Sequence, residues 1–100
     1  MTDTGVAEKV VTKTKLKEPS KFNVIYLNDE QTTMQFVVDT LMRHFDYDDV
    51  SAMDKMSEIH DKGASVVATL PYEMAEQKGV EVTIEARNLG FPLQVKVEPE

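Results

Sequence analysis

The segment Leu27–Met34 carries the side chains best suited to binding chemistry. Its sequence, LNDEQTTM, places an amide, two carboxylates and a hydroxyl directly after an apolar run. Side chains at the end of a strand border a core instead of building it, and binding residues are often found there. Asn28, Asp29 and Glu30 therefore predict an acidic, acceptor-rich opening with Met34 as its apolar border. Such an opening suits a small cation that is attached to an apolar group.

His60 is a second candidate, contributed by a different part of the chain. It follows Met56 by four residues and Ile59 by one, so it shares a helix face with Met56. A neutral imidazole accepts a hydrogen bond from an ammonium group, whereas a protonated imidazole cannot. The same spacing fits a histidine that is satisfied within the core or solvated at its edge, and the sequence leaves this alternative open.

The other candidates also have structural interpretations. Asn28 and Asp29 are residue types common in turns, where their side chains bond the local backbone. Met34, Met53 and Met56 fit ordinary core packing, although methionine also adapts to varied apolar guests at binding surfaces. Residue types alone therefore do not decide between a turn and a binding site.

Catalysis and bound cofactors have little support in the sequence. No serine or cysteine stands in a recognisable nucleophile motif, and the four glycines form no phosphate-binding loop. His44 and His60 do not form a His-Glu-x-x-His pair. His60 and Asp61 are adjacent, so both cannot face one metal ion from a helix. We therefore predict a binding protein without catalytic residues, metal ligands or a cofactor.

Charge is distributed unevenly along the chain, whose net charge is −7. Residues 1–21 contain five lysines and three acidic residues, a net of +2, whereas residues 22–100 carry a net of −9. An acidic body argues against binding to nucleic acid or to anionic membranes. It favours cationic ligands or basic patches on protein partners, although acidity also serves solubility alone.

Length and composition predict one small folded domain, with nothing to suggest more than a monomer. Residues 1–21 contain no aromatic residue and end near Pro19-Ser20, so we expect a flexible extension followed by a folded domain at 22–100. Cysteine is absent, and no apolar run approaches the roughly 20 residues of a membrane span. The first residues lack the apolar core of a signal peptide. A cytoplasmic protein is the simplest expectation.

The apolar patterns predict three strands and three helices. Strands are expected at 22–27, 64–70 and 93–97. The first helix should begin at Thr32, with Thr32 and Gln35 as a capping box. The second should be capped by the segment Asp46-Tyr47-Asp48-Asp49 and end at Gly63.

The third helix is expected to start at Pro71, where the missing N–H is not needed. Its inner face is expected to comprise small and apolar residues: Ala75, Gly79, Val82, Ala86 and Leu89. The resulting order is β-α-α-β-α-β. We therefore predict an α+β sandwich in which a three-stranded antiparallel sheet packs against three helices.

Five motifs occur in order along this body. They are Val24–Glu30 with Thr32 and Met34, Phe36–Asp39, Met56–Gly63, Glu73–Lys78 and Pro92-Leu93. Together they resemble the ClpS family, the adaptor of the Clp protease, over nearly all of residues 22–97. The resemblance implies a binding module that recognises substrate chains beginning with Leu, Phe, Tyr or Trp. It also implies delivery of these substrates to a ClpA- or ClpC-type AAA+ unfoldase coupled to the ClpP peptidase.

The resemblance also implies roles for individual residues. Asn28 and His60 would bond the α-amino group of the substrate directly, and Asp29 and Glu30 would add negative charge and water-mediated contacts. Glu30 stands where the family commonly has a second aspartate. The residues that would surround the first side chain are Tyr26, Leu27, Thr32, Met34, Val37, Met56, Ile59 and Leu93.

Further roles implied by the resemblance lie outside this pocket. Met34 would act as a gate that rejects β-branched side chains. Glu73 and Lys78 would face the unfoldase, and the extension at residues 1–21 would serve the transfer of substrate.

Two other functions stay open at this point. One is a protein-interaction domain of similar fold, like the C-terminal domain of the ribosomal stalk protein, which does not bind chain starts. The other is a metal-dependent hydrolase that uses His60 and Asp29. Asn28 and His60 together disfavour the first of these, and metal binding and turnover would test the second.

Overall fold

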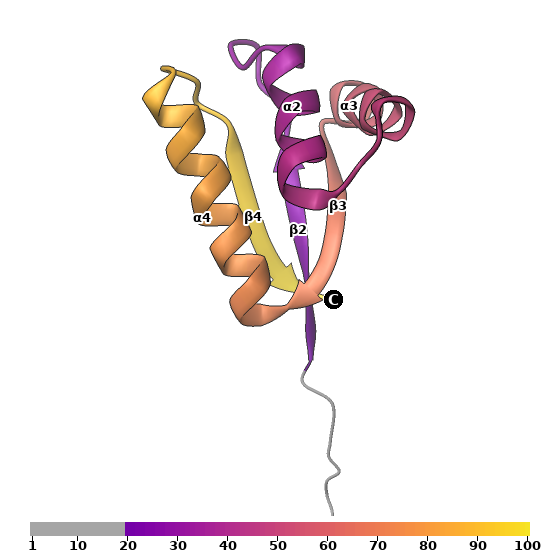
Figure 1. The fold of residues 1–100 in the computed structure, drawn as a ribbon, viewed down its shortest axis with the longest axis vertical. Coiled ribbons are helices and arrows are strands. Elements are labelled where there is room, and N and C mark those ends of the chain that lie inside the picture. The colour runs from indigo at the N-terminus through magenta and orange to yellow at the C-terminus, as the bar shows by residue number, and fades with distance from the viewer. Residues whose placement is uncertain (1–19) are drawn as a thin grey trace, which may run out of the picture.

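The structure, a computed structural model, describes residues 20–100 (Figure 1). Its elements are β2 (Lys21–Leu27), α2 (Met34–Phe45), α3 (Asp49–Lys62), β3 (Ala64–Pro71), α4 (Tyr72–Asn88) and β4 (Gln94–Pro99). This order confirms the predicted succession of strand, helix, helix, strand, helix and strand. The expected extension lies outside the described residues as far as residue 19. The strand β2 begins at Lys21.

The strands form one antiparallel sheet in the order β3-β2-β4. The first described strand is therefore the central one, with its neighbours coming from later parts of the chain. A bulge between Val24 and Ile25 interrupts its register with β3, and bulges of this kind bend and twist a strand locally. Because β2 is the central strand, Asn28, the residue after its end, lies at the middle of one end of the sheet. Elements next to β3 and next to β4 can therefore reach it.

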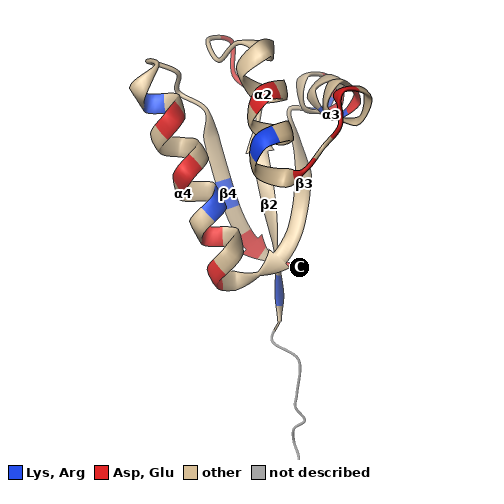
Figure 2. Cartoon of the chain, viewed as in Figure 1, with Lys and Arg blue, Asp and Glu red and all other residues tan. Residues whose placement is uncertain are grey.

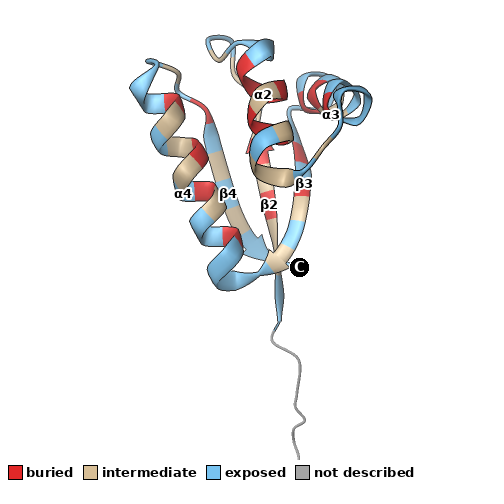
Figure 3. Ribbon diagram, in the orientation of Figure 1, coloured by how far each residue is buried: buried red, intermediate tan, exposed pale blue. Residues whose placement is uncertain are grey.

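The helices cover one face of this sheet. Val24 and Tyr26 are fully buried on β2, whereas Ile25 and Leu27 between and beside them are only partly buried, as expected when side chains alternate between two faces. The helix α3 contacts β3 and α4 contacts β4, while α2 lies between the two helices (Figures 1 and 3). The predicted α+β sandwich is confirmed.

A buried hydrogen bond fixes α2 to the central strand. The Tyr26 hydroxyl lies 2.8 Å from Thr40 Oγ1, and that hydroxyl in turn donates to the Val37 carbonyl at 2.9 Å. Burial raises the pKa of the Tyr26 phenol, so the group stays protonated and can donate. Because Val37 lies one turn from the start of α2, this chain of bonds also sets the position of the helix start.

The other end of α2 is joined to α4 by charged groups. Arg43 forms an ion pair with Glu85 at 2.6 Å, and His44 Nε2 lies 2.8 Å from the same carboxylate. The hydrogen bond from Arg43 holds the pKa of Glu85 below its usual value, and burial acts in the opposite direction. These contacts connect two helices that share few others.

The capping residue of the first helix is Thr33, one residue later than predicted. The Thr33 hydroxyl accepts a hydrogen bond of 3.1 Å from the Phe36 amide, and Met34 is the first helical residue. The predicted capping box of Thr32 and Gln35 is therefore wrong. The physical reason is that Thr32 is held in the preceding loop, where its hydroxyl donates to Asp29 at 2.7 Å and its amide donates to the same carboxylate.

The second helix begins and ends close to the predicted residues. Asp48 caps its start through a reciprocal pair of bonds with Ser51, which is the capping-box arrangement. Gly63 ends it with a φ of 87°, a conformation that glycine adopts without steric cost. This confirms Gly63 as the end of the helix.

The third helix departs from the prediction at both ends. Pro71 is the last residue of β3 and precedes the first helical residue, Tyr72. Ala75, Gly79, Val82 and Ala86 are buried as expected, but Leu89 is 63% exposed. The helix ends at Asn88, so Leu89 leaves the helical path and cannot continue its inner face. Within residues 20–100, no helix combines the length and apolar character that a membrane span requires.

Candidate functional site

A hollow of about 350 Å³ opens at the junction of β2, α2 and α3. Its wall combines polar and apolar side chains from the loop after β2, the start of α2 and the second half of α3. The lining residues are Asn28, Asp29, Glu30, Thr32, Met34, Val37, Met56, Ile59 and His60. All four residues expected to bind an amino group, and five of the eight expected to surround a side chain, thus meet in one place.

The apolar part of the hollow is a buried floor with an exposed border. Val37, Met56 and Ile59 are between 3% and 9% exposed, whereas Met34 is 53% exposed. A guest side chain that reached the floor would leave water, and Met34 stands where such a guest would pass. This agrees with the position at the border that the sequence predicts for Met34.

Three residues predicted for the pocket do not line it. Tyr26 and Leu93 are 0% and 1% exposed and belong to the core. Leu27 follows Tyr26 on the strand and therefore points to the other face. It lines a separate hollow of about 240 Å³, together with Asn28, Asp29, Pro92 and Gln94.

The two halves of the polar opening are brought together by a backbone hydrogen bond. The amide of Asn28 donates to the carbonyl of Gly63 at 2.9 Å. Gly63 ends the helix that carries His60 three residues earlier. The bond therefore joins the end of β2 to the last turn of α3, and so places Asn28 and His60 on one hollow. The sequence predicts Gly63 as a helix end but carries no signal for this long-range partner.

Asp29 organises the loop between β2 and α2. Its Oδ1 accepts hydrogen bonds from the backbone amides of Gln31 and Thr32 at 2.8 and 2.7 Å, and its Oδ2 accepts from the Thr32 hydroxyl at 2.7 Å. Partial burial acts to raise the pKa of Asp29, but the bonds from Thr32 and Gln31 outweigh it and lower that pKa. Asp29 is therefore ionised at neutral pH, with most of its acceptor capacity already used.

Glu30 and His60 have exposed side chains at the rim of the hollow. Together with Asn28 they present oxygen and nitrogen acceptors to a ligand that enters from solvent. Within residues 20–100, no group of three or more His, Asp or Glu side chains is arranged to hold a metal ion.

Glu73 and Lys78 lie on the first turns of α4 and do not line the hollow. Glu73 is exposed and Lys78 is partly exposed. The loop after β2 lies at the opposite end of the molecule from the start of α4 (Figures 1 and 2). Any role of these two residues is thus separate from the hollow.

Comparisons with known proteins place the chain in one family. Residues 17–96 match the model of the family described as ATP-dependent Clp protease adaptor protein ClpS. An ATP-dependent Clp protease adapter protein ClpS from Wolinella succinogenes is 36% identical over 96 residues, which cover 96% of this chain and 90% of that protein. The protein of the same name from Campylobacter jejuni is 42% identical over 87 residues, covering 87% and 91%.

A solved structure agrees with these sequence comparisons. The structure of Agrobacterium tumefaciens ClpS2 bound to L-phenylalaninamide superposes with a TM-score of 0.80 at 32% sequence identity. It covers 83% of this chain and 100% of that one. The fold, the order of the elements and the sequence relatives lead to the same conclusion. The chain belongs to the ClpS family of Clp protease adaptor proteins.

Proposed function

We propose that this adaptor binds the free α-amino group and the bulky apolar first residue of a substrate chain. The first residues accepted are Leu, Phe, Tyr and Trp. The bound substrate is then delivered to a ClpA- or ClpC-type AAA+ unfoldase that works with ClpP. The observation that carries the proposal is the pairing of an acceptor-rich opening with a buried apolar floor in one hollow.

The ligand of the related Agrobacterium structure has matching chemistry. L-phenylalaninamide combines a free amino group with an aromatic side chain, and it is bound to a protein 32% identical to this one. An α-amino group has a pKa of about 7.7–8, so it is largely cationic at neutral pH. In the proposed complex this cation meets Asn28 and His60 as direct acceptors. An internal residue of a substrate has no such charge.

The two acidic residues take different parts in the proposed complex. Asp29 already accepts three hydrogen bonds within the loop, so it contributes its negative charge and holds Thr32 in place. The exposed carboxylate of Glu30 is left to approach the amino group, directly or through water. Its side chain is one methylene longer than the aspartate common in the family.

The energies of the two parts are similar in size. Burying a Leu or Phe side chain contributes about 1.5–3 kcal/mol, and each charge-assisted hydrogen bond contributes about 1.5–3 kcal/mol. Association itself costs several kcal/mol, so neither part alone binds well. The two contributions add, so a ligand that offers both binds more tightly than a ligand that offers only one. Recognition therefore needs a free amine and a fitting side chain at the same time.

Delivery is assigned to surfaces outside the hollow. Glu73 and Lys78 are proposed to contact the unfoldase, and the segment before β2 is proposed to take part in the transfer. The test is degradation of a reporter protein that begins with Leu by a purified ClpA- or ClpC-type unfoldase with ClpP. The adaptor should accelerate degradation of this reporter and not of one that begins with Met. Equal rates with and without the adaptor, for both unfoldases, would refute delivery.

A further inference from the structure

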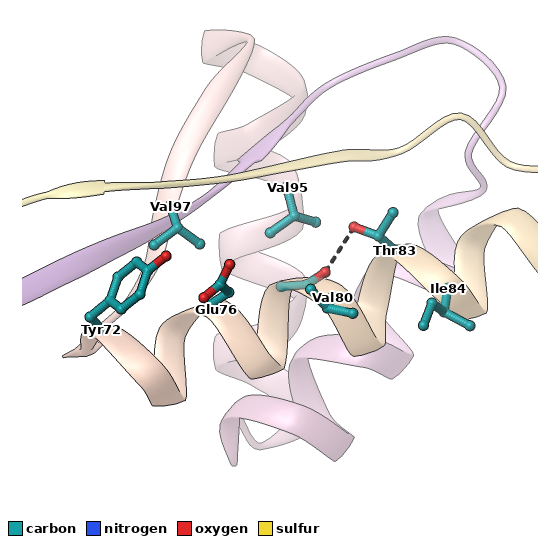
Figure 4. A pocket seen from close by; sticks show the side chains of 8 residues that line it. Tyr72, Glu76, Val80, Thr83, Ile84, Val95 and Val97 are labelled. Carbon is teal, nitrogen blue, oxygen red and sulfur yellow. Dashed lines mark hydrogen bonds between the residues drawn. The ribbon is translucent and has the colours of Figure 1, made fainter.

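A second hollow, of about 380 Å³, runs between α4 and the edge strand β4. Figure 4 shows its walls: Tyr72, Val80 and Ile84 come from the helix, and Val95 and Val97 from the strand. Gly79 lies between them, where a Cβ would touch Val97 and Val95 at 3.5 and 3.6 Å. The absence of a side chain at Gly79 thus deepens the hollow.

This groove exposes apolar side chains that the fold itself does not cover. Tyr72, Val80 and Ile84 are 47%, 50% and 55% exposed, and they share one side of one helix. A contiguous apolar patch on a small protein usually marks a binding surface. Among residues 20–100, the strand beside it, β4, pairs only with β2, so no other described strand covers its outer edge.

The chain enters the fold beside one end of this groove. The ring of Phe22 packs edge-on against Tyr72 with centroids 4.9 Å apart, and the Glu100 amide donates to the Lys21 carbonyl at 3.1 Å. The residues before β2 therefore start from the Tyr72 end. From Tyr72 to Ile84 the helix rises about 18 Å, whereas eight extended residues span about 26 Å. A segment directly before β2 is long enough to follow the whole groove.

The charges along the groove change sign from one end to the other. Glu73 and Glu76 lie on the first turns of α4, at the end near Tyr72, and Glu76 keeps the pKa of the Tyr72 phenol above its usual value. At the far end Arg87 and Lys96 line a neighbouring hollow that shares Val95 with the groove. The order from the chain entry outward is acidic, apolar and basic.

The sequence before β2 has the complementary order. Residues 8–17 read EKVVTKTKLK. Read backwards from residue 17, the segment has lysines at positions 17, 15 and 13. Val11 and Val10 follow, and Glu8 lies beyond Lys9. The lysines would meet the acidic end, the valines the apolar middle and Glu8 the basic end.

We propose that residues 8–17 bind in the α4–β4 groove of the same chain, in the direction of β4. The segment thereby covers the apolar wall of the groove. Because it belongs to the same chain, its local concentration at the groove is always high. The charged ends set the direction, and the two valines lie along the apolar part of the groove. Bound in this way, the segment also lies beside Glu73. This residue belongs to the surface that is proposed to contact the unfoldase.

The test is paramagnetic relaxation on the full chain. The protein has no cysteine, so Thr14→Cys gives a single site for a nitroxide label, and methyl NMR reports on Val80, Ile84, Val95 and Val97. We expect these methyl peaks to lose intensity selectively, and to regain it when the nitroxide is reduced. In about 1 M salt, where the screening length is about 3 Å, the selective loss should be smaller.

Two variants and one control separate the possible outcomes. Ile84→Glu should abolish the selective loss, as should exchange of Lys13, Lys15 and Lys17 for Glu. Val50→Glu serves as the control, because Val50 is 71% exposed on another helix, and it should change nothing. A loss spread evenly over the surface would overturn the proposal. So would a selective loss that arises only between spin-labelled and isotope-labelled chains in a mixed sample, because that result would assign the groove to a second copy.

Discussion

The Thr32 hydroxyl donates a hydrogen bond of 2.7 Å to Asp29 Oδ2, and the Thr32 amide donates to Oδ1 of the same carboxylate. This double contact closes the loop between β2 and α2. It explains why Thr32 lies in the wall of the hollow and not at the start of the helix. It also makes Asp29 a positioning residue, whose charge is fixed by the loop it holds.

Asp29→Asn should lower the free energy of unfolding at pH 7 by about 1 kcal/mol, the typical net value of a hydrogen bond in a protein. The folded-state pKa of Asp29 is lowered, so its contribution is complete above the unfolded value of about 3.9. It is lost as the pH falls through the folded value. The difference between parent and variant should therefore be constant from pH 7 to 5 and shrink towards pH 3.

Urea unfolding at pH 7, 5 and 3 measures this difference. Asp54→Asn is the control, because Asp54 is exposed on α3 and its substitution should leave the unfolding free energy unchanged. A difference for Asp29→Asn that stays the same at pH 3 would contradict the role of its ionised carboxylate.

His60→Ala should weaken the binding of a peptide that begins with Phe by at least about 1 kcal/mol, because one acceptor for the ammonium group is lost. His44→Ala is the matched control: His44 contacts Glu85 between α2 and α4 and does not line the hollow. Fluorescence anisotropy with a dye-labelled peptide gives both affinities. Equal dissociation constants for parent and His60→Ala would remove His60 from the site.

Met34→Ala should allow peptides that begin with Ile or Val to bind, because the variant removes the side chain at the border of the hollow. Met53→Ala is a close control, since Met53 is 52% exposed and Met34 is 53% exposed, and only Met34 lines the hollow. Competition titrations with Phe-, Ile- and Val-initiated peptides measure the change. A variant as selective as the parent would show that Met34 is not the gate.

Deleting residues 1–19 should leave peptide affinity unchanged and abolish delivery to the unfoldase. The deletion stops before Lys21 because β2 starts there. Peptide titration and reporter degradation with the same preparation separate the two effects. Degradation at the parent rate would show that the segment has no part in transfer, and a loss of peptide affinity would show that it contributes to the hollow.

The sequence was sufficient to predict elements whose signals are local. The acidic run at 46–49, Gly63 and the alternating strands mark their boundaries through capping and periodicity, and the structure confirms them to within one or two residues. The start of α2 was misjudged because Thr32 and Thr33 are equally good caps. The hydrogen bonds between Thr32 and Asp29 hold Thr32 in the loop and leave Thr33 as the cap.

The site was predictable in composition and less so in geometry. Asn28 and His60 have the right chemistry, but their meeting depends on the hydrogen bond from Asn28 to Gly63, which no local pattern encodes. Tyr26 and Leu93 illustrate the reverse case. Tyr26 is two residues before Asn28 and Leu93 is far from the site in sequence, yet burial assigns both to the core. Apolar residues of the core and of a pocket floor look alike until the fold separates them.

The most direct test of the central claim compares one Phe-initiated peptide in two forms, with a free and with an acetylated amino group. The free form should bind more tightly than the acetylated form. Acetylation removes the charge and its hydrogen bonds, worth about 1.5–3 kcal/mol each, so the affinity should fall more than about tenfold. Equal affinities for the two forms would contradict recognition of the chain start by Asn28 and His60.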